Sequence, residues 1–298
     1  MSNAWALLLV ACLGFSGCAT GRNGDAGTRI EATEVLQLNR NTTEQSAEVF
    51  LPKGFRPLSG DSLTLLLHLH GAPRAAEVSV REASSDAVLC ALHLGKLSSP
   101  YREYFSDTTA LARILESVRA ALREADGLAT PRIRRLVVTS FSAGYAGVRE
   151  LLKRPESYRM IDAVVLADGL HADTDSATMA MQMRDFCRYA LDARAGRKAM
   201  LITHSCIPTS GYESTTSTAN YLLRGIGVER HGVSVTDEIG HRTSECDSGL
   251  FRLRGYDGET GADHMKHLHA LHLLVSETLE LLDQRSAAVT RHTDPGGK

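Results

Sequence analysis

Residues 137–147 read VVTSFSAGYAG, and this stretch decides the fold. An apolar segment runs directly into small residues, and a helix-forming segment follows. The pattern predicts a strand, a tight turn that carries Ser142, and a helix. Such a turn needs small residues two positions before and after the serine, here Ser140 and Gly144, because larger side chains would clash within it. The helix N-terminus would then favour negative charge that develops beside Ser142.

Apolar runs of strand length flank this stretch and alternate with helical patterns. They are residues 63–69 (LTLLLHL), 87–92 (AVLCAL), 163–167 (AVVLA), 199–203 (AMLIT) and 233–236 (VSVT). Nearly continuous apolar runs are typical of strands that are covered on both faces. The alternation predicts an α/β domain with a mostly parallel sheet and helices on both faces. Residues 34–51 are expected to add an antiparallel pair, with a turn at 39–41.

The composition is that of an ordinary globular protein. The chain has 298 residues, of which 43% are hydrophobic and 23% are charged, with a formal net charge of −2. These proportions exclude disordered, collagen-like and coiled-coil classes. The lack of a basic excess argues against a nucleic-acid partner. No repeat or linker divides the sequence, so we expect one α/β domain over residues 31–284 and a disordered tail over 285–298.

The N-terminal segment has the features of an export signal. Residues 4–16 (AWALLLVACLGFS) are apolar but too few to span a bilayer as a stable helix. Residues 15–19 (FSGCA) resemble the lipobox of bacterial lipoproteins, in which the cysteine is lipidated. The resemblance implies a signal peptide over 1–18, a lipid anchor on Cys18 and a flexible tether over 19–30. The protein would then be held at the membrane of the bacterial cell envelope, in the periplasm or at the cell surface. Secretion without an anchor and an uncleaved buried helix are the alternatives.

The pattern around Ser142 resembles the nucleophile elbow of the α/β-hydrolase superfamily, with Ser140 in place of the usual first glycine. The resemblance covers residues 45–284. It implies the α/β-hydrolase fold, with Ser142 as the nucleophile of a serine hydrolase. Residues 52–55 (PKGF) also resemble the entry segment of secreted esterases. The alternative is an ordinary surface serine in a turn between a strand and a helix.

A His-Gly pair follows the first apolar run, in residues 68–72 (HLHGA). Hydrolases of this fold form the oxyanion hole from a backbone N–H beyond that pair and from the N–H after the nucleophile. The resemblance therefore assigns Ala72 and Ala143 as the oxyanion donors, whereas Pro73 has no N–H to offer. We expect His70 to pack against the loop or to brace it.

A glycine-rich loop, residues 255–264 (GYDGETGADH), ends in a histidine at the start of the last predicted helix. In the hydrolase fold the base lies after the last strand and before the final helix. The resemblance therefore implies His264 as the base, following the strand at 233–236, and His241 is the alternative. Helical spacing places His267 near the face of His264 and directs His269 elsewhere.

Hydrolases of this fold usually carry the acid after the strand that corresponds here to 199–203, where the next acid is Glu213. Some members, lipases among them, carry it on the preceding strand, which corresponds to 163–167 and is followed by Asp168, and this resemblance makes Asp168 the expected acid. The chain order of Ser142, Asp168 and His264 is then preserved. Asp173 and Glu213 are the alternatives, and Asp168 could instead cap the turn that follows it.

Four cysteines follow the proposed lipidation site, namely Cys90, Cys187, Cys206 and Cys246. Four cysteines in an exported protein permit three disulfide pairings. We favour Cys206 with Cys246, because both follow predicted strands near the same edge of the sheet. Buried free thiols are the alternative. The sequence has no CxxC pair, so a structural zinc site is not expected.

These features predict a hydrolase that cleaves ester or amide bonds through Ser142, His264 and Asp168 and an acyl-enzyme, without a metal or organic cofactor. A carboxylesterase acting on a small-molecule or polymer ester at the envelope is the simplest form. A non-catalytic envelope lipoprotein on the same scaffold is the main alternative, since fold does not imply function. A metal-dependent hydrolase is disfavoured, because the close histidine pairs lack the carboxylates of hydrolytic metal centres.

Overall fold

The computed structural model describes residues 26–31, 45–83 and 86–293. The predicted signal peptide, Cys18 and the expected turn at 39–41 lie outside the described residues. In the described ranges, no helix is both long enough and apolar enough to cross a membrane.

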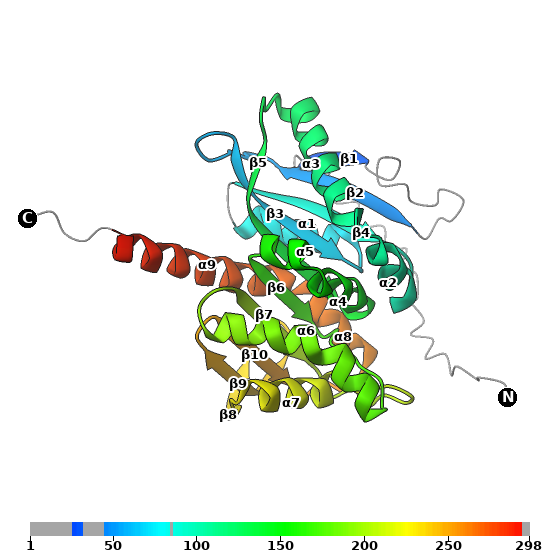
Figure 1. The fold of residues 1–298 in the computed structure, drawn as a ribbon. Coiled ribbons are helices and arrows are strands. Elements are labelled where there is room, and N and C mark those ends of the chain that lie inside the picture. The colour runs from blue at the N-terminus through cyan, green and yellow to red at the C-terminus, as the bar shows by residue number, and fades with distance from the viewer. Residues whose placement is uncertain (1–25, 32–44, 84–85, 294–298) are drawn as a thin grey trace, which may run out of the picture.

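A ten-stranded sheet forms the centre of the described part, with strand order β1-β2-β4-β3-β5-β6-β7-β10-β9-β8 (Figure 1). The strands are β1 (Gly27–Glu31), β2 (Ser46–Pro52), β3 (Ser62–Leu69), β4 (Ala87–His93), β5 (Arg132–Phe141), β6 (Ala163–Ala167), β7 (Ala199–His204), β8 (His231–Thr236), β9 (His241–Ser248) and β10 (Phe251–Tyr256). The central strands from β4 to β10 run parallel, whereas β1 with β2 and β8 with β9 add antiparallel edges. This is the mostly parallel sheet that the sequence predicts.

Helices cover both faces of the sheet, which confirms the predicted layers (Figure 1). They are α1 (Pro73–Ala83), α2 (Ser98–Ser106), α3 (Ala110–Asp126), α4 (Tyr145–Lys153), α5 (Pro155–Met160), α6 (Ser176–Arg194), α7 (Thr215–Ile226), α8 (Gly261–His269) and α9 (Leu271–Thr293). One hydrophobic core joins the sheet to α1, α8 and α9, through residues such as Val80 and Val275. The other joins it to the helices from α2 to α7, through residues such as Ile114 and Phe186.

Strand β3 explains the continuous apolar runs. Leu65 and Leu67 belong to the core beneath α2–α7, whereas Leu66 belongs to the core beneath α1 and α9. Successive side chains of a strand point to opposite faces, so a strand covered on both sides needs apolar residues at nearly every position. Each fully buried leucine contributes about 1.5–3 kcal/mol to folding.

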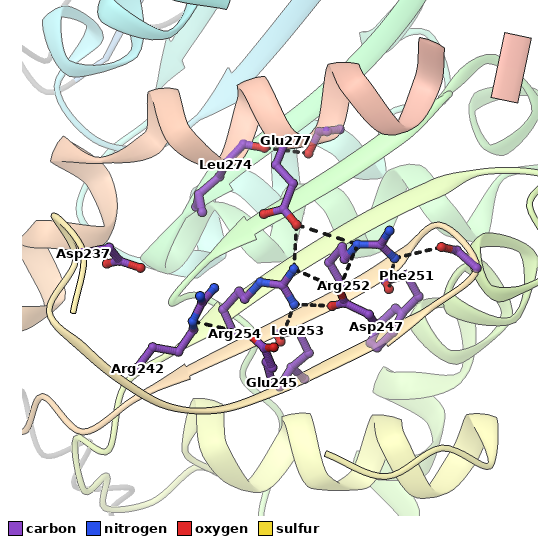
Figure 2. Close-up of polar contacts among 12 residues, drawn as sticks. Asp237, Arg242, Glu245, Asp247, Phe251, Arg252, Leu253, Arg254, Leu274 and Glu277 are labelled. Atoms are coloured by element: carbon purple, nitrogen blue, oxygen red, sulfur yellow. Dashed lines mark hydrogen bonds and ion pairs between the residues drawn. The ribbon is translucent and has the colours of Figure 1, made fainter. Parts of the chain in front are cut away.

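Strand β10, like its neighbour β9, is not predicted by the sequence pattern. It leads into the loop of His264, in place of the predicted strand at 233–236, which forms the edge strand β8. Its sequence, FRLRGY, includes two arginines, but Arg254 is buried between Asp247 of β9 and Glu277 of α9 (Figure 2). The Arg254 to Glu277 ion pair measures 2.6 Å. The positive charge of Arg254 is therefore neutralised by carboxylates from two other elements, β9 and α9.

Two element boundaries differ from the prediction. Strand β1 begins at Gly27, inside the tether expected over 19–30, and pairs with β2. Arg29 anchors it, because its guanidinium donates hydrogen bonds to both carboxylate oxygens of Glu77, at 2.8 and 2.7 Å. Helix α9 continues to Thr293, beyond the domain end expected at 284. The first residue that breaks a helix after 284 is Pro295.

Candidate active site

Ser142 lies in a turn of strained backbone between β5 and α4. Strand β5 ends at Phe141, one 3-10 turn covers Ser142–Gly144, and α4 begins at Tyr145. The φ angle of Ser142 is +46°. Residues with a Cβ rarely adopt this conformation, which costs about 1–3 kcal/mol. The strand, tight turn and helix predicted from the sequence are therefore present.

Gly144 is the residue that lets the turn pack against the neighbouring strand. A Cβ on Gly144 would lie only 2.2 Å from the carbonyl oxygen of Leu69, the last residue of β3. The absence of a side chain places the start of α4 directly against the end of β3. The loop that contains the His-Gly pair begins at this point.

The segment after β6 lies against the backbone of Ser142. A Cβ on Gly169 would lie 2.5 Å from the carbonyl oxygen of Ser142 and 2.7 Å from its nitrogen. Only glycine fits, so Asp168 is held within one residue of the serine turn. Gly169 was not among the predicted site residues, although a glycine directly after a proposed acid is a signal that could have identified it.

His264 forms a hydrogen bond with the buried carboxylate of Asp168. His264 Nδ1 lies 2.7 Å from Asp168 Oδ2, and Asp168 is 2% exposed. An ionised carboxylate only accepts hydrogen bonds, so Nδ1 carries the proton and Nε2 is left unprotonated in the neutral imidazole. His264 lies in the first turn of α8, which Thr260 caps through a reciprocal pair of hydrogen bonds with Asp263. A neutral imidazole with this tautomer can act as a base through Nε2.

Asp168 has donors on its second oxygen as well. Oδ1 accepts from the backbone nitrogen of Ser205 at 2.9 Å and from the hydroxyl of Thr215 at 2.7 Å. Burial by itself raises the pKa of the carboxyl group, but the hydrogen bond from His264, the nearby His267 and the Ser205 amide outweigh burial and hold the pKa of Asp168 well below its usual range. The carboxylate is therefore ionised throughout the neutral range. Sequence analysis did not identify Ser205 or Thr215, whose roles arise only from tertiary contacts.

His267 is connected to the acid, Asp168, through the hydroxyl of Thr203. The backbone nitrogen of Asp168 donates to the Thr203 hydroxyl at 3.1 Å, and that hydroxyl lies 2.7 Å from His267 Nδ1. Burial lowers the pKa of His267 to about 4, so the ring is neutral at neutral pH. His267 is thus a buried neighbour of the acid, whereas His269 is exposed on α8.

The ring of His264 lies over the end of β5. Its centroid is 4.4 Å from that of Phe141, the residue that precedes Ser142. The ring contact with Phe141 places His264 near the serine turn, and the close approach of Gly169 to the Ser142 backbone places Asp168 there as well. Ser142, Asp168 and His264 therefore lie together at the carboxyl end of the sheet. The carboxyl ends of parallel strands are where α/β sheets bind their ligands.

The two alternative acids have other partners. Asp173 is exposed, and its Oδ1 accepts from the backbone nitrogen of Asp175 at 2.9 Å, just before α6. The backbone of Glu213 pairs with Ala172 in an isolated bridge. Among the described residues, the carboxylate that accepts a hydrogen bond from His264 belongs to Asp168.

The loop of the predicted oxyanion donors lies beside the serine turn. His70 has a φ angle of +73°, and its Nδ1 lies 3.2 Å from the Gly95 carbonyl oxygen and 3.1 Å from the Tyr101 hydroxyl. Burial, with the nearby His93 and His68, lowers the pKa of His70 to about 3. His70 therefore braces this loop as a neutral ring, while the role of Ala72 and Ala143 stays a prediction.

The alternative base, His241, lies in a second Ser-His-Asp arrangement at the edge of the sheet. Its Nδ1 is 2.7 Å from Asp257 Oδ2 and its Nε2 is 3.1 Å from Ser234 Oγ. Ser234 is an exposed residue of the extended strand β8, and the Asp257 side chain is 53% exposed. Exposed ion pairs are screened by water and contribute little. The buried partner and the strained serine favour His264 over His241.

The predicted disulfide between Cys206 and Cys246 is wrong, because both are free thiols in the structure. Cys246 of β9 lies opposite Leu253 of β10, and Leu253 lies opposite Ile202 of β7. Strand β10 therefore separates β7 from β9 by two strand spacings, about 9–10 Å in total. Cys206 also lies beyond Ile202 along the chain, so the Cα atoms cannot approach to the roughly 4.4–6.8 Å that a disulfide needs.

Comparisons with known proteins give distant structural likenesses. No protein-family model matches the sequence, and no curated protein sequence does. A ferulic acid esterase is 14% identical with a TM-score of 0.47, over 84% of this chain and 97% of that chain. An S-formylglutathione hydrolase from Staphylococcus aureus is 13% identical with a TM-score of 0.43, over 86% and 98%. A thermostable esterase is 16% identical with a TM-score of 0.45, over 88% and 63%. These similarities are too low to assign a reaction to this chain.

Proposed function

We propose that the protein is a serine hydrolase that cleaves carboxylic esters through Ser142, His264 and Asp168. The observation that carries the proposal is the hydrogen bond between His264 and the buried carboxylate of Asp168, beside a serine of positive φ. Strained backbone and a buried carboxylate both cost free energy, and both are typical of catalytic sites. A serine with only a structural role would not need strained backbone, and a histidine with only a structural role would not need a buried carboxylate as its partner.

In the first step, the Ser142 hydroxyl oxygen attacks the ester carbonyl carbon while its proton passes to His264 Nε2. The tetrahedral intermediate then collapses, and the carbon–oxygen bond to the alcohol breaks. The proton on Nε2 passes to the departing alkoxide, so the alcohol leaves neutral and the acyl group stays on Ser142. Asp168 remains ionised and stabilises the imidazolium that forms in between.

In the second step, water attacks the acyl-enzyme and gives up a proton to His264 Nε2. The bond to Ser142 Oγ breaks, and the proton returns to that oxygen, so the free acid and the resting enzyme are restored. The N–H groups of Ala72 and Ala143 are proposed to donate to the oxyanion in both steps. Loss of one such donor costs about 2.7–4 kcal/mol in known hydrolases.

Turnover of p-nitrophenyl acetate and butyrate tests the proposal. Ser142→Ala should lower kcat by at least about 10³, whereas Ser234→Ala, in the second Ser-His-Asp arrangement, should keep wild-type turnover. Circular dichroism would show that both variants are folded. A folded wild-type protein that turns over neither ester would instead favour the non-catalytic alternative. A matched p-nitroanilide would show whether amides are also cleaved.

We propose further that the enzyme acts at the bacterial cell envelope, tethered by lipid on Cys18. The support is the FSGCA sequence that ends the apolar segment at 4–16. Metabolic labelling with an alkyne fatty acid should mark the full-length protein, and Cys18→Ala should abolish the label and release the protein from membranes. Labelling that survives in Cys18→Ala would overturn the anchor.

A further inference from the structure

Three aromatic rings lie together next to the serine turn. They belong to Tyr145, the first residue of α4, to His171, which follows Asp168 by three positions, and to Tyr212, in the loop before α7. The His171 ring is 5.5 Å from that of Tyr145 and 5.0 Å from that of Tyr212, between centroids, and it stands edge-on to both. We name these three residues the aromatic cluster.

The cluster is tied to the catalytic residues through the chain itself. Tyr145 follows Ser142 by three residues, and Gly169, which contacts the Ser142 backbone, precedes His171 by two. Asp168 and His264 both act on the pKa of His171, as charges close to it do. A substrate whose ester carbonyl reaches Ser142 would therefore have its neighbouring atoms near these rings.

His171 is held in one orientation and one tautomer. Arg149 donates to its backbone carbonyl oxygen at 2.5 Å, and the carbonyl oxygen of Glu213 lies 3.0 Å from Nδ1. A carbonyl oxygen only accepts, so Nδ1 carries the proton. Burial lowers the pKa of His171, which keeps the ring neutral. Nε2 is then an acceptor, and nothing in the described part of the chain donates to it.

Charges of both signs lie near His171. The guanidinium of Arg149 lies 4.9 Å from the Tyr145 ring centroid, whereas the carboxylate of Asp168 acts on His171 with the opposite sign. These charges oppose one another, so a cationic donor such as an ammonium group would have no dedicated counter-charge, and a neutral hydroxyl loses less hydration when it is buried. Aromatic side chains pack well against the faces and edges of other rings.

We propose that the aromatic cluster binds a neutral, hydroxyl-bearing ring of the substrate, whose hydroxyl group donates to His171 Nε2. The ring packs against Tyr145 and Tyr212, and the ester carbonyl reaches Ser142. This inference rests on the proposed esterase activity, and it narrows the substrates to esters with a hydroxylated ring near the carbonyl.

Two matched pairs of esters test the proposal. Methyl 4-hydroxybenzoate and methyl benzoate differ only in a hydroxyl on a flat ring. Methyl 4-hydroxycyclohexanecarboxylate and methyl cyclohexanecarboxylate differ in the same way on a saturated ring, as in sugars. In the wild-type enzyme, kcat/KM for the hydroxylated member of at least one pair should exceed that of its partner by about five- to tenfold, the effect of one neutral hydrogen bond. The pair that shows the preference identifies the kind of ring.

His171→Asn and His171→Phe should reduce that ratio to about one. The asparagine amide can still donate to the Glu213 carbonyl oxygen but places no acceptor at the position of Nε2, so it guards against misfolding of the phenylalanine variant. His269→Phe, on the exposed side of α8, is the matched control and should keep the wild-type ratio. A wild-type ratio of one in both pairs, or a ratio that survives in both His171 variants, would overturn the subsite.

Binding to Ser142→Ala separates this inference from the proposed activity. Saturation-transfer NMR should show stronger contact with the hydroxylated ester than with its partner, and the difference should vanish when His171→Asn is added. If the wild-type enzyme hydrolyses no ester but this difference is present, the proposed function fails and the subsite stands. If hydrolysis proceeds without any such difference, the subsite fails alone.

Discussion

His264 Nδ1 donates a hydrogen bond to Asp168 Oδ2 across 2.7 Å, although 96 residues separate the two in the chain. Ser205 and Thr215 hold the carboxylate, and the cap at Thr260 holds the first turn of α8. The ring is therefore oriented before any substrate binds, which removes an ordering cost from the reaction. The bond fixes the tautomer that leaves Nε2 able to take a proton.

Asp168→Asn should lower kcat for p-nitrophenyl acetate by about 10³–10⁴ with little change in fold. The amide keeps an oxygen for Ser205 and Thr215 but cannot hold His264 as the Nδ1–H tautomer, and the same change in a known serine protease costs about 10⁴. Steady-state kinetics with a circular dichroism melt would measure both effects. Asp173→Asn is the matched control, since Asp173 only caps a turn. An equal loss in Asp173→Asn would show that the acid is misassigned.

Thr215→Val should lower kcat by about tenfold and leave KM nearly unchanged. It removes one of the two donors to Asp168 Oδ1 while keeping the shape of the side chain, and hydrogen bonds to charged groups are worth about 1.5–3 kcal/mol. Thr278→Val serves as the control, because that buried hydroxyl bonds only its own helix, at Leu274. A rise in KM with an unchanged kcat would point to a role in substrate binding instead.

Gly169→Ala should reduce kcat by more than about tenfold. The added methyl group would meet the Ser142 backbone at 2.5–2.7 Å, so the serine turn must move, and small displacements of a reacting group cost about 10²-fold. Gly232→Ala is the matched control, because a Cβ there meets nothing within 4 Å. Wild-type kinetics in Gly169→Ala would mean that the position of the turn does not matter for the reaction.

His68 should make the protein less stable as the pH falls. Burial lowers the pKa of this ring from 6.5 to about 4, so between these values the unfolded chain binds a proton that the folded chain does not. The free energy of unfolding therefore decreases as the pH drops from 6.5 towards 4, by up to about 1.4 kcal/mol per pH unit from this residue. Above pH 6.5 the ring is neutral in both the folded and the unfolded chain, so His68 adds no further pH dependence to the free energy of unfolding.

Urea unfolding of His68→Leu at pH 7 and pH 5 measures this contribution. The variant loses the hydrogen bond between Nδ1 and Thr139, so it should be less stable than the wild type at pH 7. The gap should narrow or reverse at pH 5, because leucine binds no proton. A gap that stays constant between the two pH values would contradict the assignment of this pH dependence to His68.

Local patterns in the sequence predicted the centre of the molecule well. The elbow around Ser142 depends on neighbouring residues, and the apolar runs that became β3, β4 and β6 report burial on both faces directly. The elbow and the apolar runs need only information that lies close by in the chain. The pairing of Asp168 with His264 joins residues 96 positions apart, and it was implied by the resemblance to the α/β-hydrolase superfamily and not by a local pattern.

Features that depend on distant partners were not predictable in the same way. Strand β10 buries an arginine, Arg254, whose charge is neutralised by Glu277 of the distant helix α9. Strand β1 resembles a tether in sequence, and its ordered position depends on the ion pair of Arg29 with Glu77. The disulfide prediction failed because the sequence does not reveal that β10 inserts between β7 and β9. The aromatic cluster likewise forms from three separate segments.

A fluorophosphonate probe with peptide mass spectrometry tests most directly whether Ser142 is the activated nucleophile. We expect one adduct, on Ser142, that is abolished in Ser142→Ala, strongly slowed in His264→Ala and unchanged in Ser234→Ala. A folded protein that stays unlabelled at Ser142, or one that carries the adduct on Ser234 and loses it in His241→Ala, would show that Ser142 is not the nucleophile.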